Sequence, residues 1–302
     1  MKIANRILIT AGLTFGAGML LQAQQTFGTP QEAAQAVIDA AEHNDSAAML
    51  KIFGPGGKDI VDSGDPEQDK AGRADFARAA HEKLEVEEDP TNPDRATLSI
   101  GSEDWPFPIP LVRRDGKWHF DTAAGRMQIV AHRIGENEVN AVEICRAYVE
   151  AQMEYAAQDQ AKDGVLQYAQ KIVSSPGKRD GLYWEGASET LVPKEFAAAA
   201  EANAAEGGKK LDRFHGYYFR ILKAQGPDAP GGAFDYVVKG KMIGGFAMVA
   251  YPAEYAVSGV KTFIVSHRGV VYEKDLGPTT ATLARQLTRF NPDKSWKEVE
   301  KE

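Results

Sequence analysis

Four aromatic side chains are the best candidates for contact with a ligand. They are Trp105, Phe107, Trp118 and His119, and all four lie in the first half of the chain. Aromatic rings with a polar handle, here the ring nitrogens of the two tryptophans and of His119, suit contacts with sugars or peptides. We therefore predict these four residues at the rim of a binding pocket. In the simpler interpretation they form a hydrophobic core with one amphipathic edge and bind nothing.

The chain contains a single cysteine, Cys145, and one thiol cannot form an internal disulfide. Cys145 lies on a helical stripe with Val142, Val149, Met153 and Ala156. A catalytic cysteine also needs a positioned base, and no feature of the sequence supplies one. The pattern therefore predicts that Cys145 is a small buried side chain.

The sequence lacks the motifs of several enzyme classes. It has no glycine-rich phosphate loop and no G-x-S-x-G nucleophile elbow. Ser174 and Ser175, which precede Pro176 and Gly177, resemble a nucleophile turn only superficially and predict an ordinary loop. The six histidines are dispersed, and no two have the i, i+4 spacing of a helical metal site. We therefore predict no metal, no cofactor and a role that is more consistent with binding than with catalysis.

The first residues have the layout of a secretory signal. Lys2 and Arg6 form a positive region, and the uncharged, mostly apolar stretch that follows, 7–21, has 15 residues. Spanning a bilayer takes roughly 20 residues, so a membrane anchor fits less well. We predict a signal peptide over 1–23 with cleavage near Ala23. The mature protein is then periplasmic or secreted, without a membrane span.

The net charge of the chain indicates which classes of partner it is expected to bind. Removing Lys2 and Arg6 changes the net charge from −8 to −10. Binding to nucleic acids or anionic membranes requires clustered basic residues, and the basic residues of this sequence are scattered. We therefore expect no nucleic-acid partner, and we expect a protein or an envelope polymer instead.

Residues 29–133 combine helices with a hairpin-rich sheet. Thr29, Pro30 and Glu32 predict a helix start, with Thr29 as the cap and Glu32 completing a capping box. A second helix is predicted over 47–53, a loop over 62–72 and a third helix over 74–84. Apolar residues then alternate with polar ones, the prolines of 105–110 indicate an edge strand, and Asp115-Gly116 indicates a tight hairpin.

The remainder begins with a long helix, predicted over 124–157, in which Gly135 is the weak point. Short strands at 246–251, 261–265 and 270–274 are joined by glycine-containing turns, which predict an antiparallel meander. We thus expect an α+β fold: N-terminal helices on a curved antiparallel sheet, a long connecting helix, and a C-terminal antiparallel meander packed on that helix. The expected limits are 29–134 and 135–278 for two domains, and 279–302 for a C-terminal tail.

Parts of the chain resemble known folds. The opening helix and the hairpin DGKWHFD, at 115–121, resemble the nuclear-transport-factor-2-like (NTF2-like) fold, which implies a cone-shaped cavity used by enzymes and binding modules alike. The helix at 137–156 and the strands at 251–277 are similar to the headpiece of type IV pilins. A pilin helix starts with a long apolar segment at the mature N-terminus, whereas this one is amphipathic and follows a whole domain, which argues against filament assembly.

The mature chain as a whole resembles a family of exported bacterial proteins called domain of unknown function 2950. The resemblance rests on the stretches 145–149, 216–220, 244–252 and 270–278, and on Asn291-Pro292-Asp293 with Ser295-Trp296 near the C-terminus. It implies an exported, soluble, bacterial protein. It brings no reaction and no catalytic residue.

Three functions remain open. The first is a non-catalytic envelope protein that binds or scaffolds a protein or a polymer. The second is a periplasmic hydrolase or isomerase, with His119 or a carboxyl of displaced pKa in an N-terminal cavity. The third is a pilin-like or secretion-associated subunit. The sequence favours them in this order and leaves the substrate, the partner and the oligomeric state open.

Overall fold

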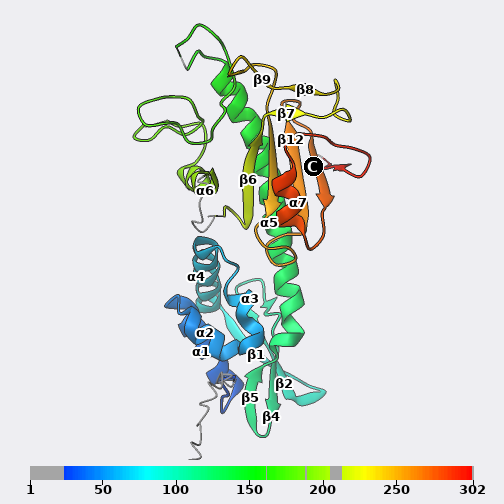
Figure 1. Ribbon diagram of the computed structural model, residues 1–302. Coiled ribbons are helices and arrows are strands. Elements are labelled where there is room, and N and C mark those ends of the chain that lie inside the picture. Colours follow the sequence, from blue (N-terminus) through cyan, green and yellow to red (C-terminus); the bar gives the residue numbers. More distant parts are fainter. Residues whose placement is uncertain (1–23, 161, 188, 205–212, 301–302) are drawn as a thin grey trace, which may run out of the picture.

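A computed structural model describes residues 24–160, 162–187, 189–204 and 213–300 of the chain. The signal peptide predicted over 1–23 lies outside these residues. The molecule has the predicted α+β fold, in which two groups of elements lie one above the other along a long helix, α5 (Thr122–Ala156) (Figure 1).

The N-terminal group packs helices against one sheet. Its helices are α1 (Pro30–Glu42), α2 (Ser46–Phe53), α3 (Lys58–Val61) and α4 (Pro66–Glu82), with a 3-10 turn over Pro55–Gly57. Its strands are β1 (Leu84–Asp89), β2 (Asn92–Ile100), β3 (Trp105–Pro106), β4 (Leu111–Arg114) and β5 (Lys117–Phe120). The strands pair antiparallel in the order β1-β2-β4-β5, and β3 pairs with the end of β2.

Two local signals of this group are confirmed. Thr29 Oγ1 accepts a hydrogen bond from the N–H of Glu32 at 3.1 Å, and the Glu32 carboxylate accepts one from the N–H of Gly28 at 2.8 Å. Asp115 and Gly116 have φ angles of 51° and 74°, which fit the mirror-image turn that joins the hairpin strands β4 and β5.

The loop predicted over 62–72 is wrong in its second half, because α4 begins at Pro66. The side chain of Asp65 caps the helix by accepting from the N–H of Gln68, and Pro66 occupies the first turn. Glu67 and Asp69 are also favourable there, because carboxylates interact well with the positive end of a helix. The polar composition of this stretch thus belongs to a helix start.

The C-terminal group contains a second antiparallel sheet, ordered β14-β13-β12-β11-β6. Its strands are β6 (Tyr217–Leu222), β11 (Ala247–Pro252), β12 (Lys261–Ser266), β13 (Val271–Asp275) and β14 (Lys297–Glu298). The predicted meander is confirmed, since β11 to β14 follow one another in the sheet. Two short ladders join β7 (Ala224–Gln225) to β8 (Phe234–Asp235) and β9 (Val237–Val238) to β10 (Lys241–Met242).

Helices cover this second sheet. Helix α5 packs against β11, β12 and β13, α6 (Lys194–Ala204) packs against β6, and α7 (Thr280–Gln286) packs against β11. In Figure 1, α7 lies in front of the sheet and α5 behind it. All six residues of β11 are buried as a result.

The stretch 279–302, expected as a tail, contains α7 and β14 in its described part. Ala284, Phe290 and Trp296 are buried in the core of the C-terminal group. Strand β14 pairs with Tyr272 and Glu273 of β13. Residues 284–298 therefore belong to the C-terminal group.

Helix α5 runs through both groups without a break at Gly135. Two separate hydrophobic cores lie against it, one formed by residues between Phe27 and Phe120 and the other by residues between Ala141 and Trp296. The boundary expected at residues 134 and 135 thus falls inside a helix. No helix in the described ranges is both long and apolar enough to cross a membrane.

Two glycines of α5 are predicted to respond in opposite ways to alanine. A Cβ on Gly125 would lie 2.5 Å from the carbonyl oxygen of Pro108 and 2.7 Å from Ile109 Cα, whereas a Cβ on Gly135 would meet nothing within 4 Å. Alanine is favoured over glycine inside a helix by about 1 kcal/mol, so Gly135→Ala is expected to raise the free energy of unfolding by about that amount. Overpacking is expected to make Gly125→Ala destabilising by about 2 kcal/mol. Urea unfolding followed by circular dichroism compares the two, and a stabilised Gly125→Ala would contradict the tight contact.

Candidate functional site

A pocket of about 300 Å³ opens in the N-terminal group, between α1 to α4, the first half of α5 and β3. Most of its lining is apolar: Val37, Ala41, Met49, Phe53, Ile60, Val61, Phe76, Trp105, Phe107 and Ile129. Its charged and hydrogen-bonding residues are Gln68, Asp69, Arg73, His132, Arg133 and Glu136. Small-molecule sites usually have this form, with a few polar groups in an apolar cleft. We call it the α4–α5 pocket.

Aromatic rings form one wall of the α4–α5 pocket. The ring of Phe107 lies 5.4 Å from that of Phe76, 6.1 Å from that of Trp105 and 6.4 Å from that of Phe53, measured between centroids. Trp105 remains 48% exposed although it lines the pocket, so it lies at the mouth. The tilted and edge-on ring pairs stabilise this wall.

The structure brings together two of the four aromatic residues predicted at a site. Trp105 and Phe107 both line the α4–α5 pocket. Trp118 is buried in the core, and Arg113 lies over its ring at 5.4 Å. His119 is the next residue of β5, and successive side chains of a strand face opposite sides of the sheet. The prediction of one rim formed by all four is therefore not met, and a binding role for Trp105 and Phe107 stays a prediction.

Two arginines of the lining hold the surrounding helices together. Arg133, on α5, donates hydrogen bonds to the carbonyls of Asp59 and Ile60, the latter at 2.8 Å. Arg73, on α4, donates to the carbonyl of Val61 at 2.6 Å. The last carbonyls of a helix have no partner within it, so the two arginines cap α3 from neighbouring helices.

Asp69 is the most buried carboxylate of the lining. Its two oxygens accept from the backbone N–H of Ser63 at 3.2 and 3.1 Å. Burial raises the pKa of Asp69 above its usual range, although the hydrogen bonds with Ser63 and the charges of Arg133 and Arg73 act in the opposite direction. A carboxyl of raised pKa in a cleft is a candidate proton donor or acceptor.

The lining contains few kinds of reactive side chain. Among the described residues that line the pocket, none is a serine, threonine, cysteine, tyrosine or lysine, so the candidate covalent nucleophiles are the two carboxylates and the imidazole of His132. The side chain of His132 is 75% exposed and lies 3.5 Å from the Glu136 carboxylate. Asp69, with its raised pKa, is the candidate acid or base of the lining.

Gln68 connects the α4–α5 pocket to the C-terminal group. Its Nε2 donates to Asn137 Oδ1 at 2.7 Å, and Asn137 Nδ2 donates to the carbonyl of Ser258 at 2.9 Å. Asn137, on α5, has 0% exposure, and Ser258 lies between β11 and β12. The other amide atom, Gln68 Oε1, is buried and receives no hydrogen bond from any described residue.

Sequence reasoning missed Gln68 and Asp69, because both fall in the stretch predicted as a loop. The helix start at Asp65-Pro66 is the signal that would have placed them on the first turns of α4. No local signal indicates that Asn137 is the partner of Gln68, since 69 residues separate them.

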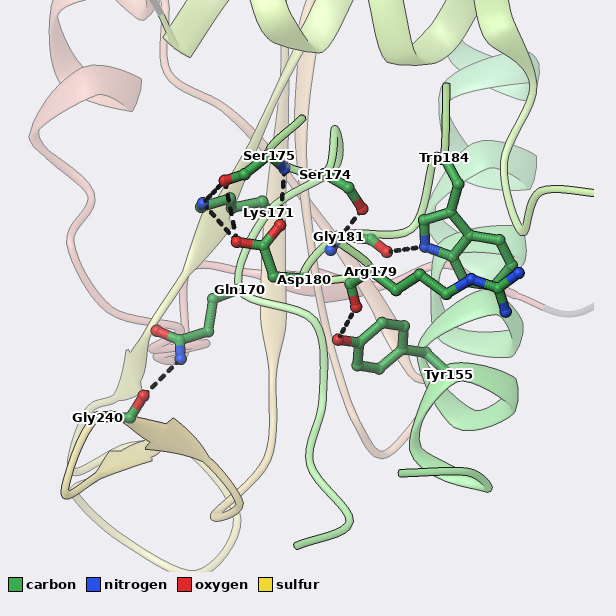
Figure 2. Close-up of polar contacts among 10 residues, drawn as sticks. All are labelled: Tyr155, Gln170, Lys171, Ser174, Ser175, Arg179, Asp180, Gly181, Trp184 and Gly240. Carbon is green, nitrogen blue, oxygen red and sulfur yellow. Dashed lines mark hydrogen bonds and ion pairs between the residues drawn. The ribbon is translucent and has the colours of Figure 1, made fainter. Parts of the chain in front are cut away.

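A second polar cluster lies in the long segment between α5 and α6 (Figure 2). Ser175 Oγ lies 2.7 Å from Lys171 Nζ and 3.0 Å from Asp180 Oδ2, so a hydroxyl, an amine and a carboxylate converge. Lys171 Nζ also pairs with Asp180 at 2.8 Å, and an ammonium group has no lone pair to accept the hydroxyl proton. Burial favours a higher pKa for Asp180, but hydrogen bonds from Lys171 and Ser175 outweigh it and lower that pKa. The cluster therefore holds a loop in place, as predicted for this turn.

Further contacts organise the same segment, and one of them ties it to α5 (Figure 2). Tyr155 Oη donates to the carbonyl of Arg179 at 2.7 Å, and Trp184 Nε1 donates to that of Gly181 at 2.8 Å. The Arg179 guanidinium lies over the Trp184 ring, 4.4 Å from its centroid. These contacts take the place of regular secondary structure.

Cys145 is buried in the C-terminal core, as predicted, and burial raises the pKa of its thiol to about 12. Thiols react as thiolates, so this one is expected to be inert in the folded protein. We expect no labelling by a disulfide reagent at about pH 8, and labelling of the single cysteine once the chain is unfolded in guanidinium. The absorbance of the released thiolate measures both, and rapid labelling of the folded protein would contradict the burial.

Asp69→Asn is predicted to change how stability depends on pH. Because the pKa of Asp69 is raised on folding, the folded protein binds this proton more tightly than the unfolded chain does. The stabilisation is present below the unfolded pKa and is lost as pH rises through the folded pKa. The stability of Asp69→Asn relative to wild type is therefore expected to increase between about pH 4 and about pH 7. Urea unfolding at both pH values measures it, and the reverse trend would show that the carboxylate form is favoured.

The sequence was compared with curated proteins, solved structures and protein families. No curated protein and no solved structure matches it, so the NTF2-like and pilin-like resemblances stay predictions. Residues 24–299 match the family described as "Protein of unknown function (DUF2950)". This range includes the α4–α5 pocket and both sheets. The chain therefore belongs to the DUF2950 family of proteins of unknown function.

Proposed function

We propose that the protein is exported to the cell envelope and binds a small, largely apolar molecule in the α4–α5 pocket without transforming it. The export part rests on the leader, with Lys2 and Arg6 before the apolar stretch and Ala23 at the end. The binding part rests on the pocket.

The observation that supports binding most strongly is the contrast between the two kinds of lining residue. The apolar side chains present rings and methyl groups to the pocket, whereas Asp69, Arg73 and Arg133 are engaged in hydrogen bonds with Ser63 and α3. A ligand therefore gains mainly by removing apolar surface from water. A volume of about 300 Å³ is at the lower end of the range for ligand sites and suits one or two fused rings.

The charges of the lining indicate a neutral ligand. Asp69 and Glu136 oppose Arg73 and Arg133, so the formal charges of the four side chains cancel. A charged ligand would lose its hydration without a free counter-charge to replace it, and this loss is costly in an apolar cleft.

The raised pKa of Asp69 favours one alternative, a hydrolase or isomerase that uses this carboxyl as acid or base. Such an enzyme also needs a group that stabilises the charge developed in the substrate. Arg73 and Arg133 are the charged candidates, and both already bind α3. Binding without catalysis therefore remains the first proposal.

Gly72 allows a direct test of the α4–α5 pocket. It lines the pocket on α4, and a Cβ added to it would meet nothing within 4 Å. We expect Gly72→Leu to fill the mouth and to weaken binding of benzofuran, a neutral bicyclic probe, by about tenfold, because the ring loses apolar contact. Gly72→Ala is the matched control, since it adds helix propensity but little volume. Nuclear magnetic resonance titration measures both affinities.

Two results would contradict the proposal. One is an absence of saturable binding to the wild-type protein by benzofuran and by other neutral rings of the same shape. The other is equal binding to wild type and Gly72→Leu, which would locate the probe elsewhere on the molecule.

A further inference from the structure

We infer that Gln68 makes the α4–α5 pocket selective for ligands that donate a hydrogen bond. The inference rests on the proposed function and deepens it, because it names the chemistry of the ligand. It follows from the orientation of two amide groups and from the engagement of the other polar residues of the lining.

The Ser258 carbonyl determines which atom of the Asn137 amide is oxygen and which is nitrogen, and through Asn137 it determines the same for Gln68. The Ser258 carbonyl can only accept a hydrogen bond, so the atom of Asn137 that lies 2.9 Å from it must be the Nδ2 donor. Asn137 Oδ1 therefore faces Gln68 and requires a donor, which is Gln68 Nε2 at 2.7 Å. Exchanging oxygen and nitrogen in either side chain would place like groups together. In this series of hydrogen bonds from Ser258 through Asn137 to Gln68, the acceptor Gln68 Oε1 is the atom left without a partner among the described residues.

The free oxygen belongs to a residue of the pocket wall. Gln68 lines the pocket and is half-buried on α4, and its Oε1 has no donor among the described residues. A buried acceptor without a donor is unfavourable, so a ligand that supplies one gains more than from an exposed hydrogen bond. The oxygen is covered in this structure, so contact with a ligand requires the Gln68 side chain to move.

A hydrogen-bond acceptor on a ligand would meet fewer free donors in the same pocket. The Nη atoms of Arg73 bind the Val61 carbonyl and Asn44 Oδ1, and those of Arg133 bind carbonyls of α3. The expected ligand is therefore a neutral ring system that carries a hydroxyl or an N–H group.

The test compares three bicyclic probes of similar shape. Indole carries a ring N–H, benzofuran carries a ring oxygen in its place, and N-methylindole keeps the indole ring without the donor. We expect the wild-type protein to bind indole about tenfold more tightly than either of the others, the usual effect of one additional buried hydrogen bond. Nuclear magnetic resonance titration measures the three dissociation constants.

Gln68→Met removes the acceptor and keeps an unbranched side chain of similar length. Indole and benzofuran are expected to bind this variant about equally, because the acceptor that we assign to the N–H, Gln68 Oε1, is removed. Lys70→Met, at an exposed position of the same helix, is the matched control and is expected to keep the wild-type preference. If Gln68→Met fails to fold, the comparison of indole with N-methylindole on the wild-type protein still tests whether the pocket prefers a ligand that donates a hydrogen bond.

The outcomes separate this inference from the proposed function. Equal binding of indole and N-methylindole to wild type, or a preference that survives in Gln68→Met, would overturn the role of Gln68. The pocket would still stand as a binding site if Gly72→Leu weakened all three probes. Failure of all three to bind saturably would overturn the proposed function, and the inference with it.

Discussion

Helix α5 is the element against which both halves of the molecule are built. Its first half places Gly125 and Ile129 against the N-terminal core, and its second half places Cys145 and Tyr148 in the C-terminal core. A helix of 35 residues is about 50 Å long, and helices in water owe most of their stability to the apolar surface that they bury. The two cores and the helix therefore stabilise one another, although no core residue is shared between them.

The α4–α5 pocket follows from how the short helix α3 is held. Helix α3 has only four residues, and Arg73 and Arg133 bind its carbonyls from α4 and α5. These bonds fix the distances between three helices, and the aromatic wall around Phe107 closes the remaining side. Because the same polar contacts stabilise the fold and shape the pocket, a ligand meets a wall that is largely organised before it binds.

Local chemistry accounts for what the sequence predicted well. The cap at Thr29 and the turn at Asp115-Gly116 each depend on residues next to one another in the chain. The start of α4 depends on a similar signal, Asp65-Pro66, and reading this stretch by its polarity alone led to the wrong prediction. Trp118 and His119 are adjacent in β5, and the alternation of side chains along a strand is by itself enough to exclude a rim that both residues share.

The rest of the candidate site depends on contacts between distant segments. Gln68 and Asn137 are 69 residues apart, and Asn137 and Ser258 are 121 apart. The stripe predicted around Cys145 had the right period, but Met153 is exposed and Gln152 is buried, where its side chain bonds to both the N–H and the carbonyl of Ala169. Such partners come from a loop whose course has no periodic pattern, so they could not be predicted.

The return of the last residues to the second sheet has a consequence for the order of folding during synthesis. Ala284, Phe290 and Trp296 complete the C-terminal core, and β14 pairs with β13. Until these residues have left the ribosome, the C-terminal core lacks part of its side chains. The N-terminal core, whose residues end at Phe120, has no such dependence. The first half of the protein is therefore able to fold while the second half waits for the synthesis of residues 284–296.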